Sequence, residues 1–178
     1  MSEKDYLGKV RKERSLLEKI MSYVPAYRGY KERELRRESD RLIRMEIVNR
    51  LKAAKNILRR KFASPAEIRK LSDEDVYAFE ALLTRLDKVT QRIDKAVAGY
   101  AGIFDTIKVK EDKLDTIIQH DLNLIEKADL IKMRIENLTK METGKDEWKE
   151  AMDELLSKIE ELDGLIDKRS EILRGLGE

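Results

Sequence analysis

The chain has 178 residues, of which 42% are charged and 6% are aromatic, and its formal net charge at pH 7 is +2. This profile is typical of coiled coils and long-helix bundles, which need narrow apolar seams and solvated outer faces. The absence of cysteine excludes disulfides, thiolate nucleophiles and cysteine-ligated metals. No apolar run approaches the roughly 18 residues that a membrane span needs, so we expect a soluble, cytoplasmic protein.

The first expected helix covers residues 4–23 and ends before Pro25, because proline cannot donate the backbone hydrogen bond. Its apolar face should include Leu17, Ile20, Met21 and Val24. A turn rich in tyrosine follows and leads into a second helix, expected over residues 31–62.

The second helix combines an apolar side with a basic one. The apolar residues that recur at helical spacing are Leu35, Leu42, Ile43, Ile47, Leu51, Ala54 and Leu58. Six basic residues are expected on a different face as a cationic stripe: Arg37, Arg41, Arg44, Lys52, Lys55 and Arg59.

Two serines mark the next helix starts. Ser64 to Glu67 reads as a capping box with proline at the first helical position, which opens a short element. Ser72 should cap the following helix by accepting a backbone hydrogen bond, and three acids after it suit the helix dipole. The seam expected on this helix is Val76, Phe79, Leu83, Leu86, Ile93, Val97 and Tyr100, with Thr90 as its one polar position.

The glycine-rich joint 99–105 is read as a break between helices. It is either a hinge or partner groove, or a tight corner, and we favour the corner. The next helix is expected over residues 107–140, followed by a turn at 142–144 and a last helix over 145–174. The expected apolar seam of the helix over 107–140 is Ile107, Leu114, Ile117, Leu124, Ala128, Ile131, Ile135 and Leu138. The expected seam of the last helix is Trp148, Met152, Leu155, Ile159, Leu162, Ile166 and Leu173.

These elements predict an all-α fold, an antiparallel bundle of long helices with coiled-coil-like packing. Residues 72–178 should form a three-helix bundle, and residues 1–71 a basic helical hairpin. The hairpin either packs as part of one continuous domain or projects. We favour packing, because Ile43, Ile47 and Leu51 need a partner.

No catalytic, cofactor or metal site is predicted. His120 is the only histidine, and no nucleophile motif accompanies it, so we expect an ordinary surface residue. Asp121 interrupts the seam beside it. The Glu-x-x-His pairs of di-iron bundles are absent from the chain.

The most distinctive chemistry is basic and aromatic. Residues 1–70 hold 21 of the 38 lysines and arginines but 10 of the 36 acids, a balance of +11; the remainder, with 17 basic and 26 acidic residues, has a balance of −9. Arginine and tyrosine together suit phosphate groups or an acidic partner. The candidate residues for phosphate or partner binding are Tyr27, Arg28, Tyr30, Arg37, Arg41, Arg44, Lys52, Lys55 and Arg59.

The alternative interpretation is a packed aromatic turn beside a solvated helix face. In it the arginines pair with interleaved acids such as Glu34, Glu38 and Asp40 at helical spacing. These acids dilute the positive field, and we slightly favour this interpretation.

Three blocks, 25–40, 99–105 and 111–121, resemble a family of prokaryotic coiled-coil-rich proteins to which no activity is attached. This resemblance therefore implies no site. The order of a basic helical hairpin and then acidic helices is similar to the phage-shock-protein-A and ESCRT-III group, which polymerises on membranes. Pro25 and Gly29 depart from that pattern, because they interrupt the first helices.

The leading functional hypothesis is a non-enzymatic scaffold or adaptor that self-associates or binds a protein partner. Its basic helix would meet an acidic partner, including the acidic half of another copy. The alternatives are peripheral binding to an anionic membrane and, less favoured, nucleic-acid binding by the same stripe.

Overall fold

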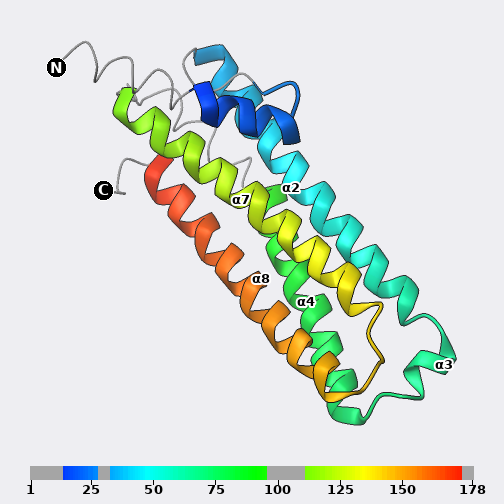
Figure 1. Cartoon of the computed structure of the whole chain (residues 1–178). Helices are drawn as coiled ribbons and strands as arrows, with labels where there is room; N and C mark the ends of the chain where they lie inside the picture. Colours follow the sequence, from blue (N-terminus) through cyan, green and yellow to red (C-terminus); the bar gives the residue numbers. More distant parts are fainter. Residues whose placement is uncertain (1–13, 28–32, 96–110, 174–178) are drawn as a thin grey trace.

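The computed structural model describes residues 14–27, 33–95 and 111–173. Its elements are helical residues 14–23, then α2 (Arg33–Lys61), α3 (Pro65–Ile68), α4 (Asp73–Lys95), α7 (Glu111–Leu138) and α8 (Asp146–Leu173). The predicted all-α bundle of long helices is confirmed (Figure 1). Proposals for residues 1–13, 28–32, 96–110 and 174–178, including Val97, Tyr100, Ile107 and the joint 99–105, lie outside the described residues.

The four long helices alternate in direction along the chain (Figure 1). Helix α2 packs against α4 and α7, and α8 packs against the same two helices. Consequently α2 and α8 occupy opposite corners of the bundle. Helix α2 is a packed fourth member of the bundle, which was the favoured alternative for the N-terminal hairpin.

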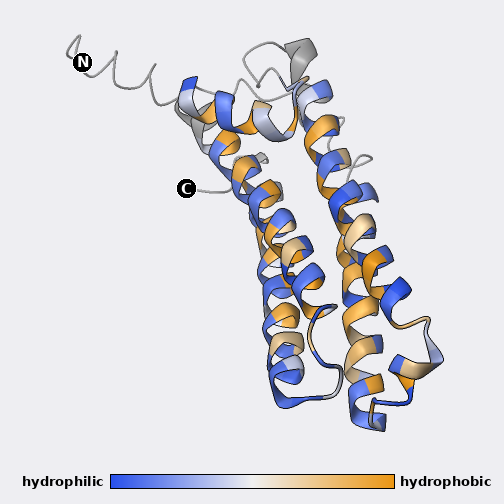
Figure 2. Cartoon of the chain, turned by 45° about the vertical axis from the view of Figure 1, so that its right-hand side comes forward, coloured by the Kyte–Doolittle hydropathy of each residue, from blue (hydrophilic) through white to orange (hydrophobic). Residues whose placement is uncertain are grey.

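One continuous apolar core is shared by these helices. Apolar residues recur along each of them, separated by hydrophilic ones (Figure 2). The seams of α7 and α8 are confirmed from Ile117 to Leu138 and from Trp148 to Ile166. Among the residues described, no helix is both long and apolar enough to cross a bilayer.

The helical residues 14–23 lie at the end of the bundle opposite α3 (Figure 1), and they stop before Pro25 as predicted. Their apolar face differs from the prediction at two positions. Leu16 is buried and Met21 is 45% exposed, so the expected contribution of Met21 was wrong. Ile20 and Val24 join the core as expected.

The seam of α4 also needs correction. Leu82 and Val89 are buried, whereas Val76, Phe79 and Leu83 are only partly buried. A strict alternation of three and four residues describes a narrow contact with one partner, but α4 packs between α2 and α8 and buries a wider face. Leu86, Thr90 and Ile93 are buried as predicted.

Caps and turns hold the α3 end of the bundle. Ser72 and Asp75 form a reciprocal capping box: the Asp75 N–H donates to Ser72 Oγ at 3.2 Å, and the Ser72 N–H donates to Asp75 Oδ2 at 3.0 Å. The capping box predicted at Ser64 is wrong, because its side chain makes no capping bond. Its expected partner Glu67 accepts a hydrogen bond from Thr143 Oγ1 at 2.6 Å instead.

The predicted turn at 142–144 is confirmed by Gly144, whose φ is +85°. A Cβ at this position would lie 2.7 Å from the Lys70 carbonyl oxygen. Glycine is therefore required here by both the backbone conformation and the close approach of the α3–α4 connection.

Candidate functional site

The structure divides the predicted cationic stripe of α2. Arg44 is buried, and its Nε donates to Asp40 Oδ2 at 2.9 Å. Lys55 turns toward α4 and pairs with Asp87. The prediction that all six bases share one exposed face is therefore wrong for Arg44. Arg44 lies three residues after Arg41, and this step places its side chain on the buried side of α2, with Ile43 and Ile47.

A smaller basic face remains on α2, formed by Arg41, Lys52 and Arg59, all of which are exposed. Within the described parts of the chain none of the three forms an ion pair. No acid follows Glu38 among the exposed residues of this helix, which are Arg41, Met45, Asn49, Lys52, Asn56, Arg59 and Arg60. We call Arg41, Lys52 and Arg59 the basic face.

The tyrosine turn fits the packing interpretation at Tyr27, the one of its two tyrosines that the structure describes. Tyr27 is fully buried, and its N–H donates to the Val24 carbonyl at 2.9 Å. A ring in this position cannot stack on a ligand. Arg28, Tyr30 and the side chain of Arg37 lie outside the described residues, so their proposed role stays a prediction.

Helix α8 carries an acidic face that the sequence analysis did not single out. Asp153, Glu160 and Glu171 are exposed and recur at helical spacing, and we call them the acidic face. Glu160 pairs with Arg85 of α4 and keeps 59% of its side chain exposed. Asp153 and Glu171 have no ion pair among the residues the structure describes.

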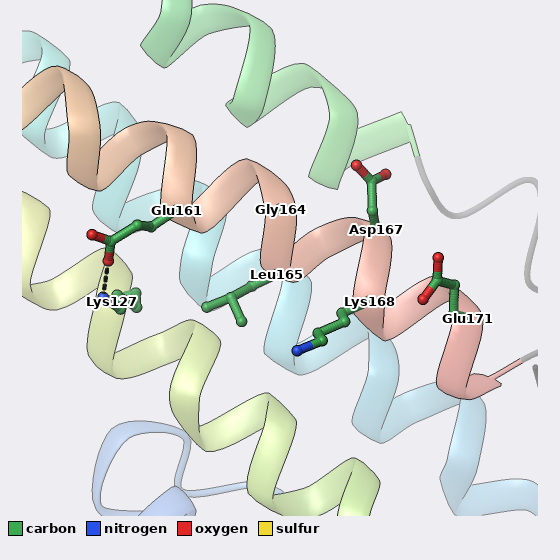
Figure 3. A pocket seen from close by; sticks show the side chains of 7 residues that line it. All are labelled: Lys127, Glu161, Gly164, Leu165, Asp167, Lys168 and Glu171. Atoms are coloured by element: carbon green, nitrogen blue, oxygen red, sulfur yellow. Dashed lines mark hydrogen bonds and ion pairs between the residues drawn. The ribbon is translucent and has the colours of Figure 1, made fainter. Parts of the chain in front are cut away.

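Neighbouring acids of α8 are used within the bundle. Glu161 pairs with Lys127 of α7, as Figure 3 shows, and Asp167 points away from Lys127 and pairs with Arg92 of α4. Hydrogen bonds from Lys127 and Lys158 lower the pKa of Glu161 to about 2. These contacts attach α8 to its two neighbours, α4 and α7. Glu161 and Asp167 are thus paired within the bundle, unlike Asp153 and Glu171.

A groove of about 490 Å³ runs along the α7–α8 boundary beside the acidic face. Gly164 and Leu165 form its apolar part, and the rest of its lining is Lys127, Glu161, Asp167, Lys168 and Glu171 (Figure 3). A Cβ added at Gly164 would meet no atom within 4 Å, so the space above this glycine is open. We call this feature the α7–α8 groove.

A buried ion network lies inside the bundle, near the start of α2. It consists of Asp40, Arg44, Asp121 and Arg169, all buried. Arg169 Nε donates to Asp121 Oδ1 at 2.7 Å, and Arg169 Nη1 lies 2.8 Å from Asp40 Oδ1. Two acids and two bases thus connect α2, α7 and α8.

The surface position predicted for His120 is wrong. Its ring is buried, and its Nε2 lies 2.8 Å from the Leu165 carbonyl oxygen. The signal for this buried polar region was present in the sequence, because Asp121 interrupts an apolar seam. Its partner Arg169 is 48 residues away, however, and helical periodicity does not identify it.

The charges of the buried network compensate one another. Each network member is balanced by an opposite charge, which is the condition under which buried charges are tolerated. Within residues 14–27, 33–95 and 111–173, no group of three His, Cys, Asp or Glu side chains is placed to hold a metal ion.

Comparison with protein-family models, with curated proteins and with solved structures gives no match to this chain. The two resemblances described above therefore stay predictions.

Proposed function

We propose that this protein is a non-enzymatic helical scaffold or adaptor that acts through its charged outer faces. The observation that carries the proposal is the pair of faces of opposite sign on α2 and α8. Arg41, Lys52 and Arg59 lack internal partners, as do Asp153 and Glu171, in the described part of the chain. Charges that the fold does not neutralise are available to steer and orient a partner.

The distribution of the other charges supports this proposal. Ion pairs connect α2 with α4 through Lys55 and Asp87, and α4 with α8 through Arg85 and Glu160. The buried His120 and Asp121, the candidates closest to acid–base chemistry, are engaged by Leu165 and Arg169. Within this proposal they hold the bundle together and do not act on a substrate. A cytoplasmic location is part of the same proposal.

Peripheral binding to an anionic membrane is the second candidate, and the basic face is the observation that favours it. Each cation near such a surface contributes about 1 kcal/mol, and this contribution is lost with salt. Arg41, Lys52 and Arg59 would have to act together. Nucleic-acid binding by the same face is a third candidate, and its affinity would fall steeply with salt.

Sedimentation of the purified protein distinguishes these candidates. The protein is sedimented by itself, with anionic vesicles and with neutral vesicles, each at low and at high salt. A scaffold that self-assembles gives an oligomeric mass without lipid, and an adaptor remains monomeric until a protein partner is added. A protein that binds peripherally to anionic membranes sediments only with anionic vesicles at low salt. Absorbance near 260 nm in excess of that of the protein identifies bound nucleic acid.

The scaffold proposal fails if two results are found together. The protein stays monomeric under all of these conditions, and its surface-biotinylated form retains no other protein in a pull-down beyond those that a variant with both faces neutralised retains. The proposal also fails if binding occurs only to anionic vesicles and is abolished by Arg41→Glu with Arg59→Glu. That second outcome would make the membrane the partner of the basic face.

A further inference from the structure

Resting on the proposed function, we infer that the partner of this protein is a second copy of the same chain. The basic face of α2 on one copy docks on the acidic face of α8 on the next. The two faces lie on helices at opposite corners of the bundle, so a single molecule cannot bring them together. A neighbouring copy satisfies both signs of charge at once.

The internal ion pair between Asp40 and Arg169 fixes the relative levels of α2 and α8 along the bundle axis. It places residue 40 of α2 level with residue 169 of α8 along the bundle axis, to within the reach of the two side chains. Helices α2 and α8 run in opposite directions (Figure 1). A copy placed alongside in the same orientation therefore presents its α2 antiparallel to α8, with the same levels facing each other.

The spacing of the charges fits this register. Arg41, Lys52 and Arg59 are separated by 11 and 7 residues. On α8, read in the opposite direction, Glu171, Glu160 and Asp153 are separated by the same 11 and 7 residues. Steps of 11 and 18 residues return to within about 20° of the same side of a helix. The three bases and the three acids therefore each form one line, about 27 Å long.

Pairing Arg41 with Glu171 shifts the second copy by three residues from the level set by the internal ion pair. This is about 4.5 Å, less than one helical turn. Lys52 then faces Glu160, and Arg59 faces Asp153. The long side chains of arginine and lysine span such an offset without strain in the backbone.

Met45 supplies an apolar contact in the same interface. It lies between Arg41 and Lys52 on α2, and 46% of it is exposed. In the register that pairs Arg41 with Glu171, residue 45 faces residue 167, which lines the α7–α8 groove three residues, or about 4.5 Å, from Gly164. The open space above Gly164 and the side chain of Leu165 form the apolar part of the α7–α8 groove there. An unbranched thioether side chain fills irregular spaces of this kind.

The contact is heterologous, because each copy uses two different faces. A copy that has docked through α2 still offers its acidic face to another. Association therefore continues beyond the dimer as an open chain, because a copy in the same orientation adds no rotation that could close a ring. It weakens as salt rises, because ionic screening acts over about 8 Å at physiological ionic strength.

Charge exchange tests the inference. Variant A carries Arg41→Glu and Arg59→Glu, and variant B carries Asp153→Arg and Glu171→Arg. In A both faces are acidic, and in B both are basic, so each variant alone should sediment as a monomer at salt where the wild type associates. In a mixture of A and B, both kinds of contact are restored, and association should return to the wild-type extent.

The matched control carries Arg69→Glu and Lys140→Glu, which change the net charge as A does but lie on exposed positions away from the basic face. It should associate as the wild type does. Circular dichroism checks that all variants keep their helical content. Gly164→Trp fills the α7–α8 groove without changing a charge, and it should reduce association.

Association of A or B alone to the wild-type extent would overturn the inference, and so would a mixture that remains monomeric. If A and B still associate, the scaffold proposal stands while this interface is wrong. If the wild type itself is monomeric at low salt but retains another protein, self-docking is wrong and the adaptor form of the proposal remains.

Discussion

Replacing Arg169 by methionine tests how the buried ion network holds α2, α7 and α8 together. Arg169 is 5% exposed at its side chain, and its partners Asp40 and Asp121 are 3% and 0% exposed. Removing one partner of a buried ion pair costs about 3–5 kcal/mol, because the remaining charge stays in a poorly solvated site. We expect a loss of this size for Arg169→Met.

For a chain of this length, each kcal/mol of lost stability lowers the melting temperature by roughly 2–4 °C. Arg169→Met should therefore lower the melting temperature by roughly 6–20 °C. Thermal unfolding followed by circular dichroism measures the shift. The matched control is Arg85→Met, which breaks a pair on the surface with side chains 47% and 59% exposed. Such pairs contribute about 0–1 kcal/mol.

The double variant Arg169→Met with Asp121→Leu separates charge from packing. It removes both members of one pair, and Asp40 keeps its bond to Arg44. It should be more stable than Arg169→Met alone, because fewer unpaired charges stay buried. The reasoning is refuted if Arg169→Met costs no more than Arg85→Met, or if the double variant is the less stable of the two.

Three further predictions concern the α3 end of the bundle. Gly144→Ala should lower the free energy of unfolding by about 1–3 kcal/mol in urea titrations, because alanine is strained at a φ of +85° and its Cβ would meet the Lys70 carbonyl; an unchanged midpoint would contradict this. Ser72→Ala should cost about 1 kcal/mol through loss of the cap, and Ser72→Asp should recover most of it. The hydrogen bond from Thr143, followed by one from Lys70, lowers the pKa of Glu67 from 4.5 to about 2. This stabilisation is complete above about pH 4.5 and is lost as the pH falls through 2, so Glu67→Gln should be clearly less stable than the wild type at pH 6, and the difference should shrink at pH 2.5.

The sequence predicted the helices well because their limits depend on local chemistry. Pro25 lacks a backbone donor, Ser72 caps α4, and Gly144 adopts a left-handed φ. The seams of α7 and α8 follow from periodicity within a single helix. On α4 the same periodicity gave too narrow a seam, because it does not report that a helix has two neighbours.

The candidate site was predicted only in part. Arg41, Lys52 and Arg59 are exposed as expected, because the opposite side of α2 is apolar. Arg44 pairs with Asp40 of its own helix, but the buried network that they join depended on Asp121 of α7 and Arg169 of α8. The role of His120 depended on the Leu165 carbonyl of α8. The acidic face of α8 was present in the sequence as acids at helical spacing, but so many acids recur on this helix that the pattern predicted only an acidic net charge.

The sequence by itself determined the all-α class, the helix limits that fall within the described residues, and the inward sides of α7 and α8, since these depend on residues within a few positions of one another. The tertiary structure decided which charges remain free. Arg44 and Arg41 are three residues apart on the same helix, yet one is buried in an ion network and the other faces solvent. The difference arises from α7 and α8, whose Asp121 and Arg169 complete the network on one side of α2 and leave the other side uncovered.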